Sequence, residues 1–147
     1  MLVAIGGALG GYFATTGGGT RLPVAWEDVS RSVPPAVWAR PTISVVRDQQ
    51  KLDKLFAVAT FGAHPKPPRI DFGRREAILV TTGPRSSTGY SLNVESVTTK
   101  GGSIDVVVRE VTPSLSDKVT PKLTYPVLLI TLAKSSKHVH VKYAGRS

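Results

Sequence analysis

The sequence predicts a mainly β fold, an antiparallel β-sandwich of the immunoglobulin-like or open-barrel kind, with one short amphipathic helix. Strand-like apolar segments alternate with Gly- and Pro-rich turns from about residue 42 to residue 143. Only one segment has the periodicity of a helix. The chain of 147 residues, of which 41% are hydrophobic and 20% charged, is long enough for one domain with its own core.

The first residues predict an export segment followed by a linker. Residues 2–14 carry no charge; a stretch of this length is too short to span a bilayer but suits the apolar part of a signal peptide. We therefore expect residues 1–19 to be a signal or membrane anchor, with any membrane contact made by residues 2–14; a flexible Gly-rich terminus is the alternative. Gly and Pro are frequent in residues 20–41, which predicts a linker. One of its tryptophans, Trp26 or Trp38, is expected to pack back onto the domain.

The predicted helix covers residues 49–59. Asp48 is suited to be its N-cap, because a carboxylate there can accept a hydrogen bond from a backbone N–H of the first turn. The prolines of residues 64–69 then end regular structure. The apolar positions follow the spacing of one helix face: Leu52, Leu55, Phe56 and Ala59.

The remaining apolar segments predict strands. The continuous run over residues 76–82 is typical of a buried strand, and the run over residues 127–132 is typical of a central one. The glycines of residues 100–103 predict a hairpin turn. The strands are expected at residues 43–46, 76–82, 90–98, 104–111, 127–132 and 138–143, with a possible bulge in the third, a long irregular connection at 113–126 and a tail at 144–147.

Several classes of chemistry lack the residues they need. The chain has no cysteine, which excludes disulfides and thiolate nucleophiles. His138 and His140 would share one face of a strand, but His64 lies far away in sequence, and zinc needs three or four such ligands. No nucleophile elbow or phosphate-binding loop is present. We therefore expect no catalytic residues, no metal, no cofactor and no small-molecule substrate.

The net charge of +9 is concentrated at the two ends of the chain. Residues 1–70 hold eight Lys and Arg against four Asp and Glu, and residues 134–147 hold four against none. Residues 71–133 are nearly neutral, with seven against six. Nucleic-acid binders more often cluster basic residues on one element, with aromatic residues between them. The distribution therefore favours solubilising flanks over a nucleic-acid partner.

A set of short motifs resembles the protease complex subunit PrcB family, over roughly residues 42–141 and most closely over residues 71–133. Two positions depart from the family pattern: the usual double glycine is Thr88-Gly89, and Tyr125-Pro126 replaces Pro-Tyr. The resemblance implies an exported, non-catalytic bacterial subunit that associates with a protease or another envelope protein. The matching positions are Asp71, Phe72, Gly83, Gly89, Tyr90, Ser91, Thr124 and Pro126.

The turn over residues 84–88 is the first candidate for contact with a partner, because polar loop tips on a rigid scaffold often bind. At this tip Arg85 could donate two hydrogen bonds to a partner's carboxylate. Gly89 is expected to supply a left-handed or closely packed backbone, and Tyr90 to anchor the next strand in the core. The candidate contact residues are Arg85, Ser86, Ser87 and Thr88, with Lys118 and Lys122 on the long connection.

Two other functions remain open. The turn over residues 86–91 also resembles a loop of the chagasin-type cysteine-peptidase inhibitors, although the other loops of that family are missing. The basic flanks are compatible with a binder of polyanions, such as nucleic acid or an envelope polymer. In the accessory-subunit interpretation, docking would use strand-end loops or an exposed sheet edge.

Overall fold

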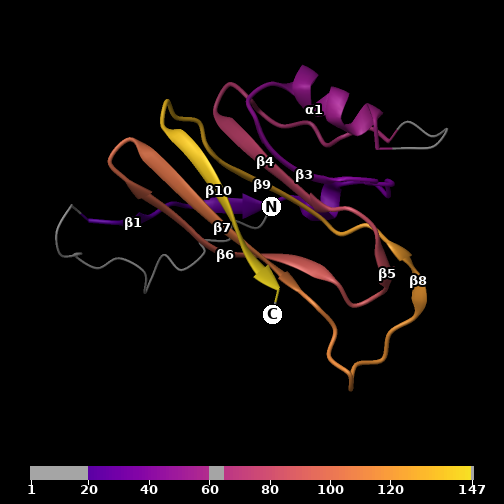
Figure 1. Cartoon of the computed structure of the whole chain (residues 1–147). Helices are drawn as coiled ribbons and strands as arrows, with labels where there is room; N and C mark the ends of the chain where they lie inside the picture. Colours follow the sequence, from indigo (N-terminus) through magenta and orange to yellow (C-terminus); the bar gives the residue numbers. More distant parts are fainter. Residues whose placement is uncertain (1–19, 60–64, 147) are drawn as a thin grey trace.

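The structure, a computed structural model, describes residues 20–59 and 65–146. Two four-stranded sheets pack face to face, and they remain separate rather than closing into a barrel (Figure 1). The fold is therefore mainly β, as predicted. The β7 sheet has the order β1 (Leu22–Pro23), β6 (Ser91–Lys100), β7 (Ser103–Val111) and β10 (His138–Arg146); the β4 sheet has the order β2 (Trp26–Asp28), β9 (Val127–Ala133), β4 (Arg75–Thr82) and β3 (Pro41–Val46).

A helix, a 3-10 turn and a two-stranded ribbon complete the chain that the structure describes. The helix α1 (Gln49–Ala57) lies against the outer face of the β4 sheet, and a short 3-10 turn, η1 (Ser30–Ser32), precedes β3. The strands β5 (Arg85–Ser87) and β8 (Pro121–Thr124) form a two-stranded ribbon at one end of the sandwich (Figure 1). The capping of α1 is as predicted, because the Asp48 side chain accepts a hydrogen bond of 2.7 Å from the Lys51 backbone N–H.

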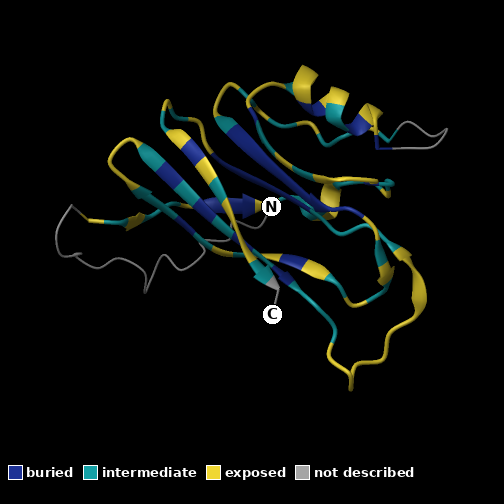
Figure 2. Cartoon of the chain, in the orientation of Figure 1, coloured by how far each residue is buried: buried dark blue, intermediate teal, exposed yellow. Residues whose placement is uncertain are grey.

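The main core lies between the two sheets and follows the alternation of their strands. Along β7 every second residue is buried, so one face of the strand points into the core and the other is partly exposed to solvent. Figure 2 shows this banding on β7 and β10. The buried members of this core are Trp26, Ile78, Val80, Leu92, Val97, Ile104, Val106, Val108, Leu128, Ile130, Leu132 and Val139.

A second core lies between the β4 sheet and α1. Phe56 of the helix meets Trp38 edge to face, with ring centroids 5.0 Å apart. Strands β4 and β9 therefore have apolar neighbours on both faces, which accounts for their continuous apolar runs. The buried members are Trp38, Val46, Leu52, Phe56, Ala59, Ala77, Leu79 and Leu129.

The structure corrects the predicted linker over residues 20–41. This segment contains β1, β2 and η1, and both of its tryptophans are buried, Trp26 between the sheets and Trp38 under the helix. The physical reason is that Trp26–Asp28 pairs with β9 along an edge that would otherwise be open. The export segment predicted at residues 1–19 lies outside the described residues. No helix within residues 20–59 and 65–146 is long and apolar enough to cross a membrane.

Several boundaries also differ from the prediction. The strand expected at residues 90–98 runs from Ser91 to Lys100, with the expected irregularity between Val94 and Ser96. The last strand, β10, continues through the predicted tail to Arg146 and pairs with β7 in parallel, whereas every other pair of strands is antiparallel. The connection predicted to be irregular contains β8.

Candidate functional site

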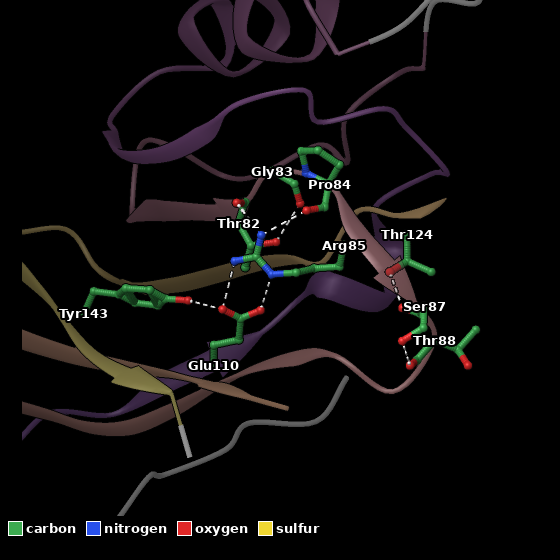
Figure 3. A network of polar contacts seen from close by, with 9 residues as sticks. All are labelled: Thr82, Gly83, Pro84, Arg85, Ser87, Thr88, Glu110, Thr124 and Tyr143. Atoms are coloured by element: carbon green, nitrogen blue, oxygen red, sulfur yellow. Dashed lines mark hydrogen bonds and ion pairs between the residues drawn. The ribbon is translucent and has the colours of Figure 1, made fainter. Parts of the chain in front are cut away.

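A buried ion pair lies where the ribbon of β5 and β8 joins the sandwich. Glu110 occupies the inward face of β7, in the alternation that otherwise places valine and isoleucine there, and it is fully buried. Arg85, the first residue of β5, holds it with two hydrogen bonds, Nε to Oε2 at 2.6 Å and Nη2 to Oε1 at 2.9 Å (Figure 3). This bidentate geometry is the strongest form of an arginine–carboxylate contact.

Further hydrogen bonds extend this pair into a network of four strands. The Tyr143 hydroxyl of β10 donates to Glu110 Oε1 at 2.8 Å. Arg85 Nη1 donates to the carbonyls of Thr82 and Pro84, at 3.2 and 2.9 Å (Figure 3). The hydrogen bond with Glu110 raises the pKa of Arg85 above its ordinary value. The guanidinium therefore stays charged, and the Glu110 carboxylate of the same chain neutralises it. We name this pair the Arg85 clamp, because it fixes β5 against the sandwich.

This arrangement corrects the position predicted for Arg85. The residues expected to form a loop tip, 84–88, contain strand β5, which pairs with β8. The Arg85 side chain, 17% exposed, turns inward to Glu110 instead of outward to solvent. Its donors are directed to a carboxylate and two carbonyls of its own chain, so no bidentate contact with a partner is built there. Ser86, the next residue, is exposed.

Ser87 and Thr88, the other bonded polar residues of the predicted turn, form hydrogen bonds with residues 120–124. The Thr124 hydroxyl donates to the Ser87 carbonyl at 2.8 Å. The Thr88 backbone N–H donates to the Thr120 carbonyl at 3.0 Å, and the Thr120 N–H donates to the Thr88 hydroxyl at 2.8 Å. Thr88 is therefore held against residues 113–126, which we name the β8 arm.

At two of the motif positions the backbone adopts a conformation that favours glycine. Gly83 and Gly89 have φ of +79° and +98°, which favours glycine. A Cβ on Gly89 would lie 2.9 Å from Pro113 Cβ, closer than side chains pack. The structural role predicted for Gly89 is thus confirmed. Tyr90 differs from the prediction: it is half-buried outside both cores, and Arg85 Cζ lies 6.0 Å from its ring centroid.

The remaining motif positions are mostly structural. The Asp71 side chain accepts the Gly73 backbone N–H at 3.2 Å, within the turn that leads into β4. Phe72 packs against the core under the helix. Ser91 opens β6, and the Pro126 carbonyl accepts the Thr82 N–H at 3.4 Å. The motif segments at residues 83–91 and 124–126 therefore meet around β5 and β8.

The β8 arm exposes three apolar side chains that were not predicted as contact residues. All residues from Ser114 to Leu123 are exposed (Figure 2). Leu115 is fully exposed, and Val119 and Leu123 are 39% and 65% exposed. Lys118 and Lys122, predicted to lie at the surface, are exposed between them. The sequence does contain a sign of this surface. Its apolar positions recur every four residues, in a segment that is too polar and Pro-rich to be a helix with a buried face.

His138 and His140 are not joined by a third ligand within the residues that the structure describes. The rings of His138 and His140 stack edge to face with centroids 4.4 Å apart on β10. Across the two described ranges, no group of three or more His, Asp or Glu side chains is placed to hold a metal ion. His64 lies outside those ranges.

Comparison with known proteins identifies one segment. Residues 77–133 match the family model described as PrcB C-terminal. The match confirms the resemblance predicted from the sequence; it runs from β4 to β9, and includes Arg85, Glu110 and the whole β8 arm, while Asp71 and Phe72 lie outside it. No curated protein and no solved structure matches the chain.

Proposed function

We propose, on the premise that residues 77–133 carry a PrcB C-terminal segment, that this chain is a non-catalytic, protein-binding subunit of a protease complex. The family resemblance implies the kind of partner, and the β8 arm supplies a surface to bind it. We further propose an extracytoplasmic location in a bacterial envelope, which the same resemblance implies and which suits the uncharged residues 2–14.

The exposed apolar side chains of the β8 arm carry the proposal. Single exposed apolar residues are common on protein surfaces, but Leu115, Val119 and Leu123 belong to one projecting segment. Lys118 and Lys122 alternate with them, which suits a partner surface with an apolar centre and an acidic rim.

The clamp under the arm explains how such a surface could bind with adequate affinity. Binding by a mobile loop requires ordering the loop, which opposes association. Here hydrogen bonds of Thr120 to Thr88 and of Thr124 to Ser87 hold the arm against β5 and the residue after it. The Arg85–Glu110 pair holds β5 against the sandwich. The base of the arm is therefore already ordered before it meets a partner.

The proposal is tested by affinity isolation with the full-length chain, tagged at its C-terminus and expressed in the source cells. The variant Leu115→Ser/Val119→Ser/Leu123→Ser removes the apolar surface without disturbing the clamp. We expect the unaltered chain to retain an active protease, and the variant to retain at least about tenfold less of it, since a few apolar residues dominate most interfaces.

A matched control separates the arm from general surface hydrophobicity. Leu22→Ser/Val58→Ser alters two apolar residues, 47% and 79% exposed, away from the arm and should retain the protease fully. Equal recovery by the arm variant would contradict docking through the arm. Recovery of polyanions alone, lost at high salt, would replace the proposal with the polyanion binder. Slowed papain-like proteolysis would replace it with the inhibitor.

A further inference from the structure

The two pairs of edge strands of the sandwich differ in how the chain connects them. On one side, the chain passes directly from β1 in the β7 sheet to β2 in the β4 sheet, with Val24 packed against the core between them. On the other side, the edge strands are β3 and β10, which no short connection joins. Among the described residues no further strand pairs with the outer edge of β3.

The core is incompletely covered on this open side. Ile43 of β3 is opposite Val80 in the antiparallel register and shares its inward face, yet it is 51% exposed. Tyr143, on the facing edge strand β10, is 42% exposed. Both side chains are thus partly accessible to solvent at this side of the core, although the Tyr143 hydroxyl is bonded to Glu110.

A cavity of about 300 Å³ lies between these edges. Three of its lining residues come from β3 and three from the adjacent β4, whereas β10 contributes Tyr143 alone. At one end it reaches the Arg85 clamp. Its lining residues are Pro41, Thr42, Ile43, Val80, Thr81, Thr82, Arg85 and Tyr143.

The threonine hydroxyls of this lining already bond within the chain. The hydroxyls of Thr42 and Thr81 donate to the Arg40 carbonyl at 3.2 and 2.9 Å, and the Thr82 hydroxyl donates to the Gly83 carbonyl at 2.7 Å. A polar ligand would therefore find few groups to replace its bonds with water. The cavity favours an apolar group of the size of one large side chain.

The backbone beside the cavity is open over a short stretch. In an antiparallel ladder, alternate residues of an edge strand direct their N–H and C=O groups away from the sheet. Toward the end of β3, Lys51 Nζ of the helix donates to the Val45 carbonyl at 2.9 Å, which occupies that group. Within the remaining stretch, residues 41–44, Pro41 and Ile43 share the direction of Val45. Because proline has no N–H, the groups open to a new strand beside the cavity are the carbonyls of both residues and the N–H of Ile43.

We propose that β3 is a docking edge for an extended segment of a protein partner, which adds to the β4 sheet as a fifth strand and places an apolar side chain in the cavity beside Ile43. Of the two exposed arginines that flank β3, Arg47 is ion-paired with Glu76 at 3.2 Å, whereas Arg40 lies beside Pro41 at the other end, and no lining residue is acidic. The charge thus favours an acidic residue on the side of the segment that lies beside Arg40. This second surface is distinct from the β8 arm and does not depend on the proposed function.

The test selects strand-forming peptides from a display library of random linear peptides, with the full-length chain as target. We expect enriched peptides to alternate apolar and polar residues and to carry Asp or Glu at the end that lies beside Arg40. Ile43→Asp should weaken their binding at least about tenfold, because it places a charge beside the apolar side chain. Methylation of alternate peptide nitrogens should weaken it too, because it removes the ladder hydrogen bonds.

Two controls locate the site. Leu22→Asp alters an apolar residue of similar exposure, 47%, on the edge strand of the other sheet and should leave binding unchanged. In NMR spectra, the amide shifts of Thr42, Ile43 and Ser44 should move on peptide addition. The proposal is overturned if no peptide is enriched, if binding is insensitive to Ile43→Asp, or if the shifts move only in the β8 arm.

Discussion

Glu110 is a charged residue at a position where the alternation of β7 places apolar ones. Moving a carboxylate out of water is unfavourable by several kcal/mol unless it gains a partner of opposite charge and further hydrogen bonds. Glu110 has both, from Arg85 and from the Tyr143 hydroxyl. The pair therefore fixes how the ribbon meets the sandwich, more than it adds net stability.

This view predicts unequal effects of breaking the pair and replacing it. Arg85→Ala leaves the Glu110 carboxylate buried without its cation and should lower the free energy of unfolding by about 3–5 kcal/mol. The double variant Arg85→Met/Glu110→Leu removes both charges and should lose much less. Urea unfolding followed by tryptophan fluorescence measures both. Equal losses in the two variants would show that packing, rather than the unpaired charge, is responsible.

The glycines allow backbone strain to be separated from crowding. Gly89→Ala combines a positive φ with a Cβ 2.9 Å from Pro113 and should lower the free energy of unfolding by about 2–4 kcal/mol. Gly101 has φ of +60° with nothing near its Cβ position, so its alanine variant should lose only about 1 kcal/mol. Gly102→Ala, with neither feature, is the control. Thermal unfolding measures the loss of stability in each variant. An order other than Gly89→Ala, Gly101→Ala, Gly102→Ala, from the largest loss to the smallest, would contradict this account.

The ion pair between Asp105 and Arg21 is expected to make the free energy of unfolding depend on pH in the acid range. The pKa of Asp105 lies below the ordinary value for aspartate, mainly because Arg21 donates to it a hydrogen bond of 2.7 Å. Since the folded-state pKa is below the unfolded one, the pair stabilises the fold above the ordinary carboxyl pKa. This contribution is lost as the pH falls through the lowered value.

Asp105→Asn should therefore be less stable than the unaltered chain at pH 7, by at most about 1 kcal/mol because Arg21 is 39% exposed. The difference should shrink below about pH 4 and at high salt. Urea unfolding at several pH values measures it. A difference that stays constant down to pH 2 would exclude the ion pair as its source.

At the scale of elements, β4 and β9 were the most predictable strands. Their continuous apolar runs indicated burial, and the structure adds the reason, which is that α1 covers the face of the sheet that the β7 sheet does not. The helix itself was predictable from the spacing of Leu52 and Phe56 and from the Asp48 cap. The ribbon strands β5 and β8 were not, since strands of three and four mostly exposed residues are too short to show a periodicity of their own.

Because Phe56 packs α1 against the β4 sheet, we expect its truncation to destabilise the fold strongly. Its side chain is fully buried and meets Trp38 edge to face. Phe56→Ala should lower the free energy of unfolding by about 3–5 kcal/mol through the lost contacts and the cavity left behind. Val58→Ala, at an exposed position after the same helix, is the control and should change it little. Denaturant unfolding would contradict the packing if both variants were equally stable.

At the scale of the whole molecule, the two cores share the strands β4 and β9. The chain has only two tryptophans, and each lies in a different core: Trp26 between the sheets and Trp38 under the helix. Fluorescence can therefore follow each core separately. Because β4 and β9 belong to both, we expect the cores to unfold together.

The variants Trp26→Phe and Trp38→Phe each leave one reporter, and each fluorescence signal should coincide with the circular dichroism transition of the same variant. Circular dichroism is the matched reference, because it follows the strands of both sheets. A fluorescence transition that precedes the circular dichroism transition in either variant would show that its core opens independently.

The sequence by itself determined the local features: the mainly β composition, the amphipathic helix and its cap, the buried strands, the hairpin at residues 100–103 and the resemblance to the PrcB family. The structural features depend on neighbouring residues, so periodicity and turn chemistry are enough to predict them, whereas the resemblance depends on the short motifs between residues 71 and 126. Only the tertiary structure decided that residues 22–28 join both sheets, that β10 pairs in parallel with β7, and that Arg85 faces Glu110. These depend on contacts between residues 25 or more positions apart, which local pattern does not encode.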